Sequence, residues 1–467
     1  MKAILAALLL FCSVCALAAD NGVKVPPFER VQLGNGTVVL LMERHDVPLI
    51  AFSAVLRGGA VTDPVGKSGV ASLLAGLLQK GAGSRDAVQF AEAVASVGGQ
   101  IETAASTESI SVSGSFLARD QQLMVDLVAD MLQRPRLELA QFDTLRARQI
   151  EFIRAAKESD LAALAPIYGA SHLFGGHPYG RSVDGSEASL AAITHPDLQR
   201  YYLDHVGADR LIITVAGDFK RAQLKQRLSR AFSGWRKAGT ALPSIPKPQR
   251  VATRRVLLVD APESVQSYFW AGNVAVARSD PRRPALDVTN TLFGGRFTSM
   301  LNTELRIRTG LSYSANSHFD RLLQPGHWEM GSFTQTETTI QALDLMLATL
   351  DKLHQSGLES TMVESGKSYV QGQFPVALET AAQWATQLAT LEFYGLDRSY
   401  IDDYSRQLGA VMPADAGKVI DEVFPPSTAL AIVVIGNAGA IRDSLRKYGP
   451  ITEMKLADPT FAPLSAE

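Results

Sequence analysis

Residues 69–83 read GVASLLAGLLQKGAG, and this stretch decides how the rest of the chain is interpreted. Its apolar residues leave almost no polar face, which predicts a buried helix. Lys80 and Gly81 supply a cation followed by a glycine, a common end for a helix. An apolar run with a glycine pair, LIAFSAVLRGGA (49–60), precedes it, and a second helical pattern follows over 84–97, with a serine at its start as the candidate N-cap.

The block around this helix resembles the pitrilysin/insulinase family, the zinc peptidases with an inverted motif. In active members the helix carries H-x-x-E-H, in which two histidines bind zinc and the glutamate activates the bound water. On that frame the histidine positions are Ser72 and Gly76, and the glutamate position is Ala75. None of these side chains can bind zinc or move a proton. The resemblance therefore implies a peptidase scaffold with a degenerate zinc motif.

No replacement metal site is visible in the sequence. Active family members have a third ligand, a glutamate some 75 residues beyond the motif; Glu151 lies at about that distance, but its surroundings match poorly, and we interpret it as an exposed helix residue. His172 and His177 are separated by a Gly-Gly and cannot share one helix face, so structural roles are favoured over an accidental metal site. We expect no metal or other cofactor in this chain.

A second motif lies in the other half of the chain, in FGGRFTSMLNTELRIRTGLSYSA (293–315). It resembles the family pattern G-G-x-x-x-S-x-L-x-x-x-L-R-x-x-x-G-L-x-Y at nine fixed positions. The pattern predicts a helix over 300–308 and a strand starting at 312–314, which brings Arg306 close to Tyr313. In active relatives this pair is thought to hold the substrate backbone and stabilise the oxyanion. The alternative is that Arg306 pairs with a neighbour such as the glutamate at 304, and that Tyr313 is a core residue.

An internal repeat sets the domain organisation. RLIITVAGDFKRAQLKQRL (210–228) matches TALAIVVIGNAGAIRDSL (428–445), about 219 residues further on, and the helical patterns just before each also match. The repeat indicates two related halves, 19–238 and 251–467, joined by the proline-rich linker 239–250. The family resemblance implies an α+β fold with two homologous domains, each a mostly antiparallel sheet backed by helices.

The remaining elements follow from hydrophobic period and turn signals. A strand hairpin with a Gly-Asn-Gly turn opens a meander of three strands, and two strands are expected within 100–116. The further expected elements are helices over 119–133, 139–164, 197–206 and 221–232, and a strand over 210–216.

Residues 1–18 have the features of a secretory signal peptide: one lysine, a short apolar region and Ala16-Leu17-Ala18 as a cleavage signal. The apolar region is shorter than the ~20 residues of a membrane span, so no stable membrane anchor is expected. Cleavage would remove both cysteines and leave no disulfide. We expect an exported, periplasmic protein. A net charge of −2 without basic runs gives no indication of nucleic-acid binding.

The chain thus retains one half of a split active site and lacks the other. The family resemblance implies a non-catalytic subunit of a heterodimer, in which Arg306 and Tyr313 act in trans on a peptide substrate and the zinc sits in a sister subunit. An inert structural or peptide-binding protein on the same scaffold is the alternative. An autonomous peptidase with a relocated metal site is disfavoured because no ligand set is visible.

Overall fold

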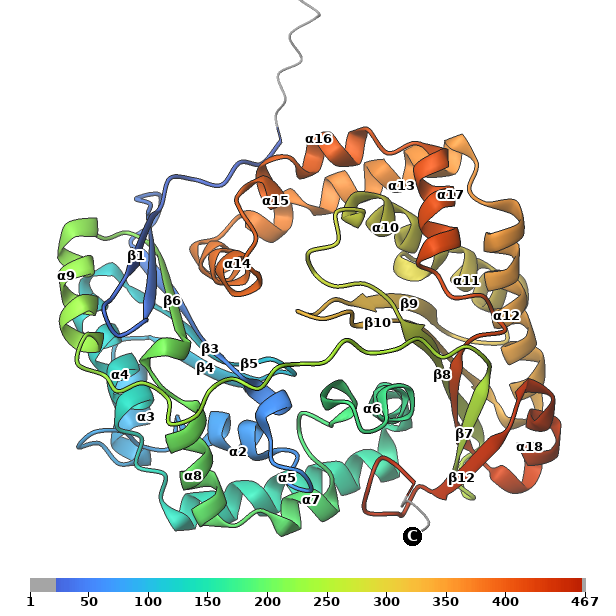
Figure 1. Cartoon of the computed structure of the whole chain (residues 1–467), viewed down its shortest axis with the longest axis horizontal. Helices are drawn as coiled ribbons and strands as arrows, with labels where there is room; N and C mark the ends of the chain where they lie inside the picture. Colours follow the sequence, from blue (N-terminus) through green and yellow to red (C-terminus); the bar gives the residue numbers. More distant parts are fainter. Residues whose placement is uncertain (1–21, 464–467) are drawn as a thin grey trace, which may run out of the picture.

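The structure is a computed structural model and describes residues 22–463, so the signal segment and both cysteines lie outside the described residues. Two six-stranded mixed sheets lie side by side, with strand orders β1-β2-β6-β3-β5-β4 and β12-β7-β11-β8-β10-β9 (Figure 1). Each sheet has helices packed on it. The α+β class and the two homologous halves are confirmed.

The first sheet (sheet A) is built from the N-terminal half. Its strands are β1 (Glu29–Gln32), β2 (Val38–Glu43), β3 (Leu49–Arg57), β4 (Gln100–Ala105), β5 (Ser109–Leu117) and β6 (Leu211–Gly217). The β1–β2 hairpin is as predicted, and only β2 and β6 run parallel. The predicted meander of three strands is wrong, because β6 lies between β2 and β3. Every residue of β6 is buried, which suits a central strand better than the half-exposed β1.

The second sheet (sheet C) repeats this arrangement. Its strands are β7 (Arg255–Asp260), β8 (Gln266–Val274), β9 (Ala315–Asp320), β10 (His327–Gln335), β11 (Ala431–Gly436) and β12 (Ile451–Lys455). β11 occupies the place of β6, running parallel to β7 and antiparallel to β8. The repeat seen in the sequence therefore corresponds to equivalent central strands in the two sheets.

Two of the differences between the observed and the expected helices of the N-terminal half have a clear local cause. The helical segments of this half are η1 (Gly59–Thr62), α2 (Val70–Leu77), α3 (Ala87–Ala95), η2 (Ala118–Asp120), α4 (Gln121–Gln133), α5 (Leu139–Ser159), α6 (Leu161–Phe174), η3 (Pro178–Gly180), α7 (Glu187–Ala192), α8 (His195–His205), η4 (Ala208–Arg210) and α9 (Arg221–Phe232). The N-cap of α3 is Asp86, which forms a capping box with Gln89, and not Ser84. The single helix expected over 139–164 is two, because Asp160 leaves the helical conformation and caps α6 through the backbone N–H of Ala163.

The C-terminal half contains two π-helical turns at the second motif (293–315). Its helical segments are α10 (Arg283–Asn290), η5 (Thr291–Gly295), α11 (Met300–Asn302), η6 (Thr303–Arg308), η7 (Thr336–Thr338), α12 (Thr339–Ser356), α13 (Ser360–Gln373), η8 (Pro375–Leu378), α14 (Ala381–Tyr394), α15 (Ser399–Asp402), α16 (Tyr404–Gly409), α17 (Pro413–Glu422), α18 (Ala438–Leu445) and η9 (Arg446–Tyr448). η5 and η6 are π-helices, so the helix expected over 300–308 starts as α11 and widens.

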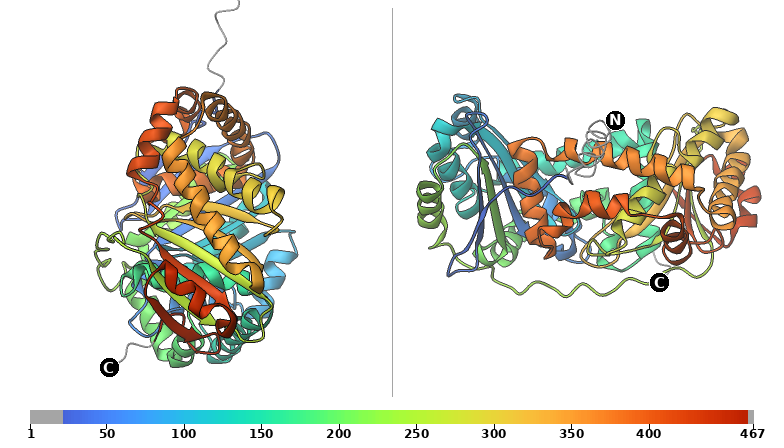
Figure 2. Two further views of the ribbon diagram at one scale, coloured as in Figure 1. Left: turned by 90° about the vertical axis from the view of Figure 1, so that its right-hand side faces the viewer. Right: turned by 90° about the horizontal axis from the view of Figure 1, so that it is seen from above.

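Each half donates one helix to the sheet of the other half. α14 packs on β3 and β6, and α6 packs on β8 and β11 (Figures 1 and 2). Thr214 in β6 donates a hydrogen bond to the carbonyl oxygen of Ala385 in α14, at 2.6 Å. Gly169 in α6 lies directly against the ring of Trp270 in β8, where any side chain would collide. The exchange means that neither sheet is covered on both faces by its own half.

The two donated helices end in the same way. Arg57 in sheet A donates hydrogen bonds to the carbonyl oxygens of Glu392 and Phe393 at the end of α14, at 3.0 and 2.7 Å. Arg255 in sheet C donates to the carbonyl oxygens of residues 172 and 173 at the end of α6, at 2.6 and 2.8 Å. A cation thus satisfies the last carbonyls of each donated helix. These contacts join the halves at two equivalent places.

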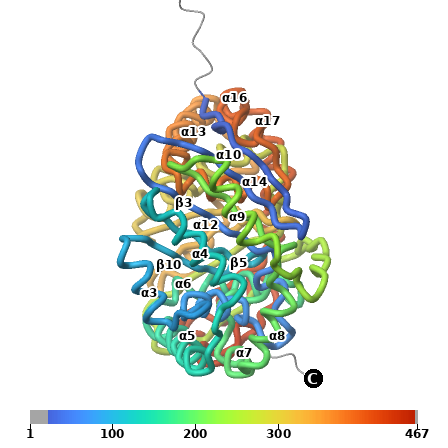
Figure 3. The backbone as a smooth tube through the Cα atoms, turned by 90° about the vertical axis from the view of Figure 1, so that its left-hand side faces the viewer, coloured from blue at the N-terminus to red at the C-terminus, as the bar shows by residue number. Residues whose placement is uncertain are grey.

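α2, α4 and α9 also pack on sheet A. Figure 3 shows α4 and α9 on the side of the molecule that faces the viewer. Residues 239–250 form no helix or strand and run along one side of the molecule from α9 towards β7 (Figure 2). This segment is held at several points, for example by Thr240 on Asp204 and by Arg250 on Val274. Within residues 22–463, no helix is both long and apolar enough to span a bilayer.

Candidate functional site

The start of α2 is fixed by a buried carboxylate. Asp63, 3% exposed, accepts hydrogen bonds from the backbone N–H groups of Gly69 and Ala71, at 2.7 and 3.1 Å. Such capping satisfies donors that the first turn of a helix leaves free. Burial raises the pKa of Asp63 to about 7, against the opposing effect of these two hydrogen bonds. The helix that carries the degenerate motif is therefore firmly anchored.

The motif positions of α2 face α5. Ser72 donates to a carboxylate oxygen of Asp184 at 2.7 Å, and Gln149 in α5 donates to the carbonyl oxygen of Asp184 at 2.6 Å and to the Ser72 hydroxyl at 3.4 Å. A side chain at Gly76 would first meet Leu145, one helical turn before Gln149. Ala75 is 2% exposed and packs in the core. A small hydrogen-bond network and apolar contacts therefore occupy this face.

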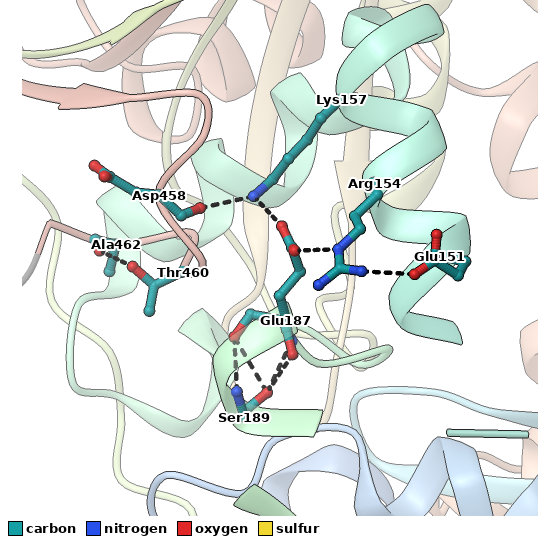
Figure 4. Close-up of polar contacts among 9 residues, drawn as sticks. Glu151, Arg154, Lys157, Glu187, Ser189, Asp458, Thr460 and Ala462 are labelled. Carbon is teal, nitrogen blue, oxygen red and sulfur yellow. Dashed lines mark hydrogen bonds and ion pairs between the residues drawn. The ribbon is translucent and has the colours of Figure 1, made fainter. Parts of the chain in front are cut away.

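Glu151 does not point toward α2. Its side chain is 67% exposed and pairs with Arg154 at 2.6 Å. Arg154 in turn contacts Glu187, which also binds Lys157 (Figure 4). The interpretation of Glu151 as an exposed helix residue agrees with this geometry, and the residue of α5 that faces Ser72 is Gln149.

The donor set at this face does not fit zinc. A serine hydroxyl, a glycine, an alanine and a carboxamide supply no imidazole or thiolate, and Asp184 is already engaged by Ser72. Within residues 22–463, no group of three or more His, Cys, Asp or Glu side chains is arranged to hold a metal ion. The residues at this face therefore do not fit a zinc ion.

His172 and His177, considered above as an accidental metal site, form contacts with backbone carbonyl oxygens instead. His172 lies near the carbonyl oxygen of Arg255, at 3.4 Å, and His177 contacts the carbonyl oxygen of Pro246, at 2.9 Å. Burial, with the neighbouring Arg255 charge, lowers the pKa of His172 to about 4. His172 is thus neutral at physiological pH, and His177 holds the segment that joins the halves.

Arg306 and Tyr313 are brought together as predicted. The guanidinium carbon of Arg306 lies 4.3 Å from the centre of the Tyr313 ring and 4.8 Å from that of Phe297. Tyr313 is 72% exposed and Phe297 60% exposed, so Tyr313 is not a core residue. Cation–π contacts of this kind hold a guanidinium in place and leave its N–H donors free.

Arg306 is not paired with Glu304. That carboxylate binds Arg308 at 2.7 Å and lies 3.6 Å from Lys352. Among the described residues, no hydrogen-bond or ion-pair partner of the Arg306 guanidinium is found. The arginine therefore presents unused donors on an exposed surface.

The backbone around this pair is closely determined. Gly310 has φ 65°, a conformation that favours glycine, and it ends the helical segment. Beyond it, the Ser332 hydroxyl donates to the Ser312 hydroxyl at 2.9 Å, and Asn302 accepts from the N–H of Ala315 at 3.4 Å. The strand expected from 312–314 starts at Ala315. These contacts fix the loop that carries Tyr313.

A further set of residues connects the two halves. Tyr179 donates to the carboxylate of Glu108 at 2.5 Å, and the same carboxylate accepts from the N–H of Leu323, at 3.0 and 3.1 Å to its two oxygens. The N–H of Gln324 donates to Tyr179 at 3.0 Å. Burial raises the pKa of Glu108 against the lowering effect of these donors. Tyr179, in a His-Pro-Tyr-Gly loop, thus holds the β9–β10 turn of the other half.

Comparison with known sequences identifies the family. The profile of the insulinase family (peptidase family M16) matches residues 38–185, and that of the peptidase M16 inactive domain matches residues 192–369. The chain belongs to the insulinase family. This insulinase-family protein is 25% identical over 409 residues to an uncharacterized zinc protease of Streptomyces coelicolor, across 86% of this chain and 89% of the relative.

Other relatives of the insulinase-family chain carry a different description. A non-peptidase homolog from Helicobacter pylori, YmxG, is 22% identical over 366 residues, across 78% of this chain and 83% of the relative. The crystal structure of a peptidase M16 inactive domain from Pseudomonas fluorescens shares the fold, with a TM-score of 0.82 and 21% identity over 88% of this chain and 98% of that one. The likeness to the Pseudomonas structure shows the shared fold, and the inactive-domain profile over residues 192–369 supports a family member of the inactive type.

Three features of the site were not predicted from the sequence. Gln149 lies four residues after Leu145 on the face of α5 that meets α2, and helical phase identifies it only once that face is known. Phe297 lies inside the second motif, but nothing in its spacing marks it as a partner of Arg306. Glu108 and Tyr179 are far apart in the chain and carry no local signal.

Proposed function

We propose that this chain is the non-catalytic subunit of a heterodimeric insulinase-family zinc peptidase. It supplies Arg306 and Tyr313 to a peptide that is cleaved at the zinc of a sister subunit. Zinc belongs to the sister subunit in this proposal. The signal-peptide features of residues 1–18 support export to the periplasm as the place of action.

The asymmetry between the two motifs carries the proposal. At the face of α2 that carries the degenerate zinc motif, Ser72 and Gln149 form hydrogen bonds with each other and with Asp184. At the second motif, Arg306 is held against aromatic rings with its donors unused, although an acidic residue lies two positions away. Because ring faces alone hold the Arg306 guanidinium, all of its N–H donors stay available to a ligand.

The chemistry of the pair suits a peptide. A guanidinium presents a fixed fork of donors to carbonyl oxygens, and a phenol adds one directional donor. Donors placed where negative charge develops on the scissile carbonyl stabilise the transition state of hydrolysis. Arg306 and Tyr313 can therefore bind the substrate backbone without any metal in their own chain.

A second candidate function is an inert structural or peptide-binding protein. The likeness to a non-peptidase homolog favours it. In that case the chain would have no effect on the turnover of any zinc-bearing relative. The presence or absence of stimulated peptide hydrolysis separates the two candidates.

The test combines the mature chain with a zinc-motif sister protein encoded in the same genome and measures hydrolysis of a mixed peptide library. Arg306→Ala should lower kcat/KM of the pair by about 100-fold, the usual effect of losing one such donor. Arg308→Ala is the matched control, because Arg308 is two residues away and paired with Glu304. Assembly, followed by size-exclusion chromatography, should be unchanged in both variants. Equal activity of the two variants would reject the proposed role of Arg306.

A further inference from the structure

A small cavity lies where α14 crosses sheet A. Its volume is about 250 Å³, and it lies between β3 and β5 of one half and α14 of the other. Arg278, from the segment that follows β8, closes one side. The cavity therefore exists only because the C-terminal half places its helix on this sheet.

Six of the residues that line the cavity are serines or threonines. Ser53 in β3 and Ser113 in β5 are cross-strand neighbours, and Ser111 lies two residues along from Ser113. Among the described residues, the hydroxyls of Ser53 and Ser113 have no hydrogen-bond partner. Thr386 and Thr390 also line the cavity, but their hydroxyls donate to the carbonyl oxygens of Ala382 and Thr386 within α14, so they offer the cavity acceptors only. The wall thus offers neutral donors and acceptors at short spacing.

Arg278 is the charged group of the cavity, and it lacks a polar partner. Its Nε is buried without a hydrogen bond, and no hydrogen bond or ion pair of its guanidinium is found among residues 22–463. Five other arginines also have a buried nitrogen without a hydrogen bond, but each makes a hydrogen bond or ion pair through its side chain: Arg210, Arg221, Arg255, Arg296 and Arg321. A partly buried cation without a partner is costly, and a ligand anion would satisfy it.

The surroundings of Arg278 keep it available. Its guanidinium carbon lies 5.3 Å from the centre of the Tyr394 ring, which orients the group without using its donors. Burial and the neighbouring Glu108 raise the pKa of Tyr394 to about 12, so this phenol keeps its proton. Glu108 itself is engaged by Tyr179 and Leu323. Glu102 in β4 lies opposite Ser113 in the register of the sheet, but it does not line the cavity.

We propose that this cavity binds an oxyanion, with Arg278 as its charged donor and the hydroxyls of Ser53 and Ser113 as neutral donors. About 250 Å³ is below the usual volume of a pocket for drug-sized ligands and fits a single terminal group. We assign the carboxylate at the C-terminus of a peptide as the ligand. The choice of a peptide rests on the proposed function. The site would hold one end of a peptide, away from the degenerate zinc motif of α2.

The experiment titrates the mature chain alone, without a sister subunit, by calorimetry. Three probes are used: N-acetyl-trialanine with a free carboxylate, the same peptide as its carboxamide, and inorganic phosphate. Arg278→Gln removes the charge, and Ser113→Val fills the wall without touching the arginine. Arg236→Gln is the matched control, since Arg236 also lies over a tyrosine ring, Tyr202, but outside the cavity. Thermal unfolding verifies that each variant is folded.

The expected result is that the free carboxylate binds at least about tenfold more tightly than the carboxamide, and that Arg278→Gln and Ser113→Val both remove this difference, whereas Arg236→Gln keeps it. Phosphate binding that depends on Arg278, with equal affinity for the two peptides, would support the oxyanion site and reject the peptide as its source. Failure of all three probes to bind, or affinities unchanged by Arg278→Gln, would overturn the site. None of these binding results bears on the Arg306 test, which measures hydrolysis by the pair.

Discussion

The guanidinium of Arg306 lies over the face of the Tyr313 ring, with 4.3 Å between its central carbon and the ring centre. The ring therefore has two separable roles, because it positions the arginine and carries a phenol of its own. Tyr313→Phe keeps the first role and loses one donor, whereas Tyr313→Ala loses both.

We expect Tyr313→Phe to lower kcat/KM of the assembled pair by about tenfold, the effect of one neutral hydrogen bond. Tyr313→Ala should lower it about as far as Arg306→Ala, since the arginine is no longer held. Steady-state hydrolysis of one defined peptide by the pair measures both. Wild-type activity of Tyr313→Ala would contradict the positioning role.

The contact between Ser72 and Gln149 predicts how a zinc site could be rebuilt. Ser72→His with Gly76→His restores two ligands, and adding Gln149→Glu should tighten zinc binding by at least about tenfold, because a third ligand then faces them. The two-histidine variant retains Glu151, which points elsewhere. Competition with a chromogenic chelator measures the affinities. Equal affinity of the two variants would show that Gln149 does not occupy the third-ligand position.

Asp63 predicts a pH dependence of stability. Its pKa is raised to about 7 by burial, so between pH 4 and 7 the folded chain holds a proton at this group that the unfolded chain has lost. This contribution to the free energy of unfolding is fully present below about pH 4 and declines as the pH rises through about 7. Asp63→Asn, which cannot titrate, should lack it.

Urea unfolding of the wild type and of Asp63→Asn at several pH values between 4 and 8 provides the comparison. The difference between their unfolding free energies should shift in favour of Asp63→Asn as the pH rises. A constant difference across this range would mean that Asp63 is ionised throughout.

The exchanged helices predict that the halves depend on each other. Residues 19–246 expressed alone would leave the apolar side chains of Leu40 and Ile212 bare, where Trp384 and Leu388 of α14 now cover them. We expect this fragment to aggregate or to unfold without cooperativity. Co-expression with residues 247–467 should yield a soluble complex with one cooperative transition. A cooperative transition of the isolated fragment would contradict this dependence.

The sequence predicts the paired halves well, because β6 and β11 sit at equivalent places in a duplicated pattern. It does not predict which sheet α6 packs against. Leu164 and Tyr168 indicate burial, but a helix that is apolar on several faces gives no direction for its partner. The break at Asp160 was likewise hidden, because a single aspartate can either continue an exposed helix or cap a new one.

The residues of the candidate site likewise differ in how far the sequence predicts their contacts. Arg306 and Tyr313 are close in sequence, so a motif with fixed spacing brings them together. Gln149 and Ser72 come from different helices, and a distance of about 75 residues does not determine which face of α5 meets α2. Helical phase resolves that choice only once the crossing of the two helices is known.

Because α14 covers sheet A but comes late in the sequence, it is synthesised long after the strands that it covers. β6 is complete at Gly217, whereas α14 begins at Ala381. At roughly 5–20 residues per second, a ribosome needs about ten to thirty seconds to synthesise the intervening segment. If sheet A forms during that interval, one of its faces has no cover from its own chain. Protection of that face from other chains, by a chaperone or by delayed folding, is therefore a requirement of this architecture.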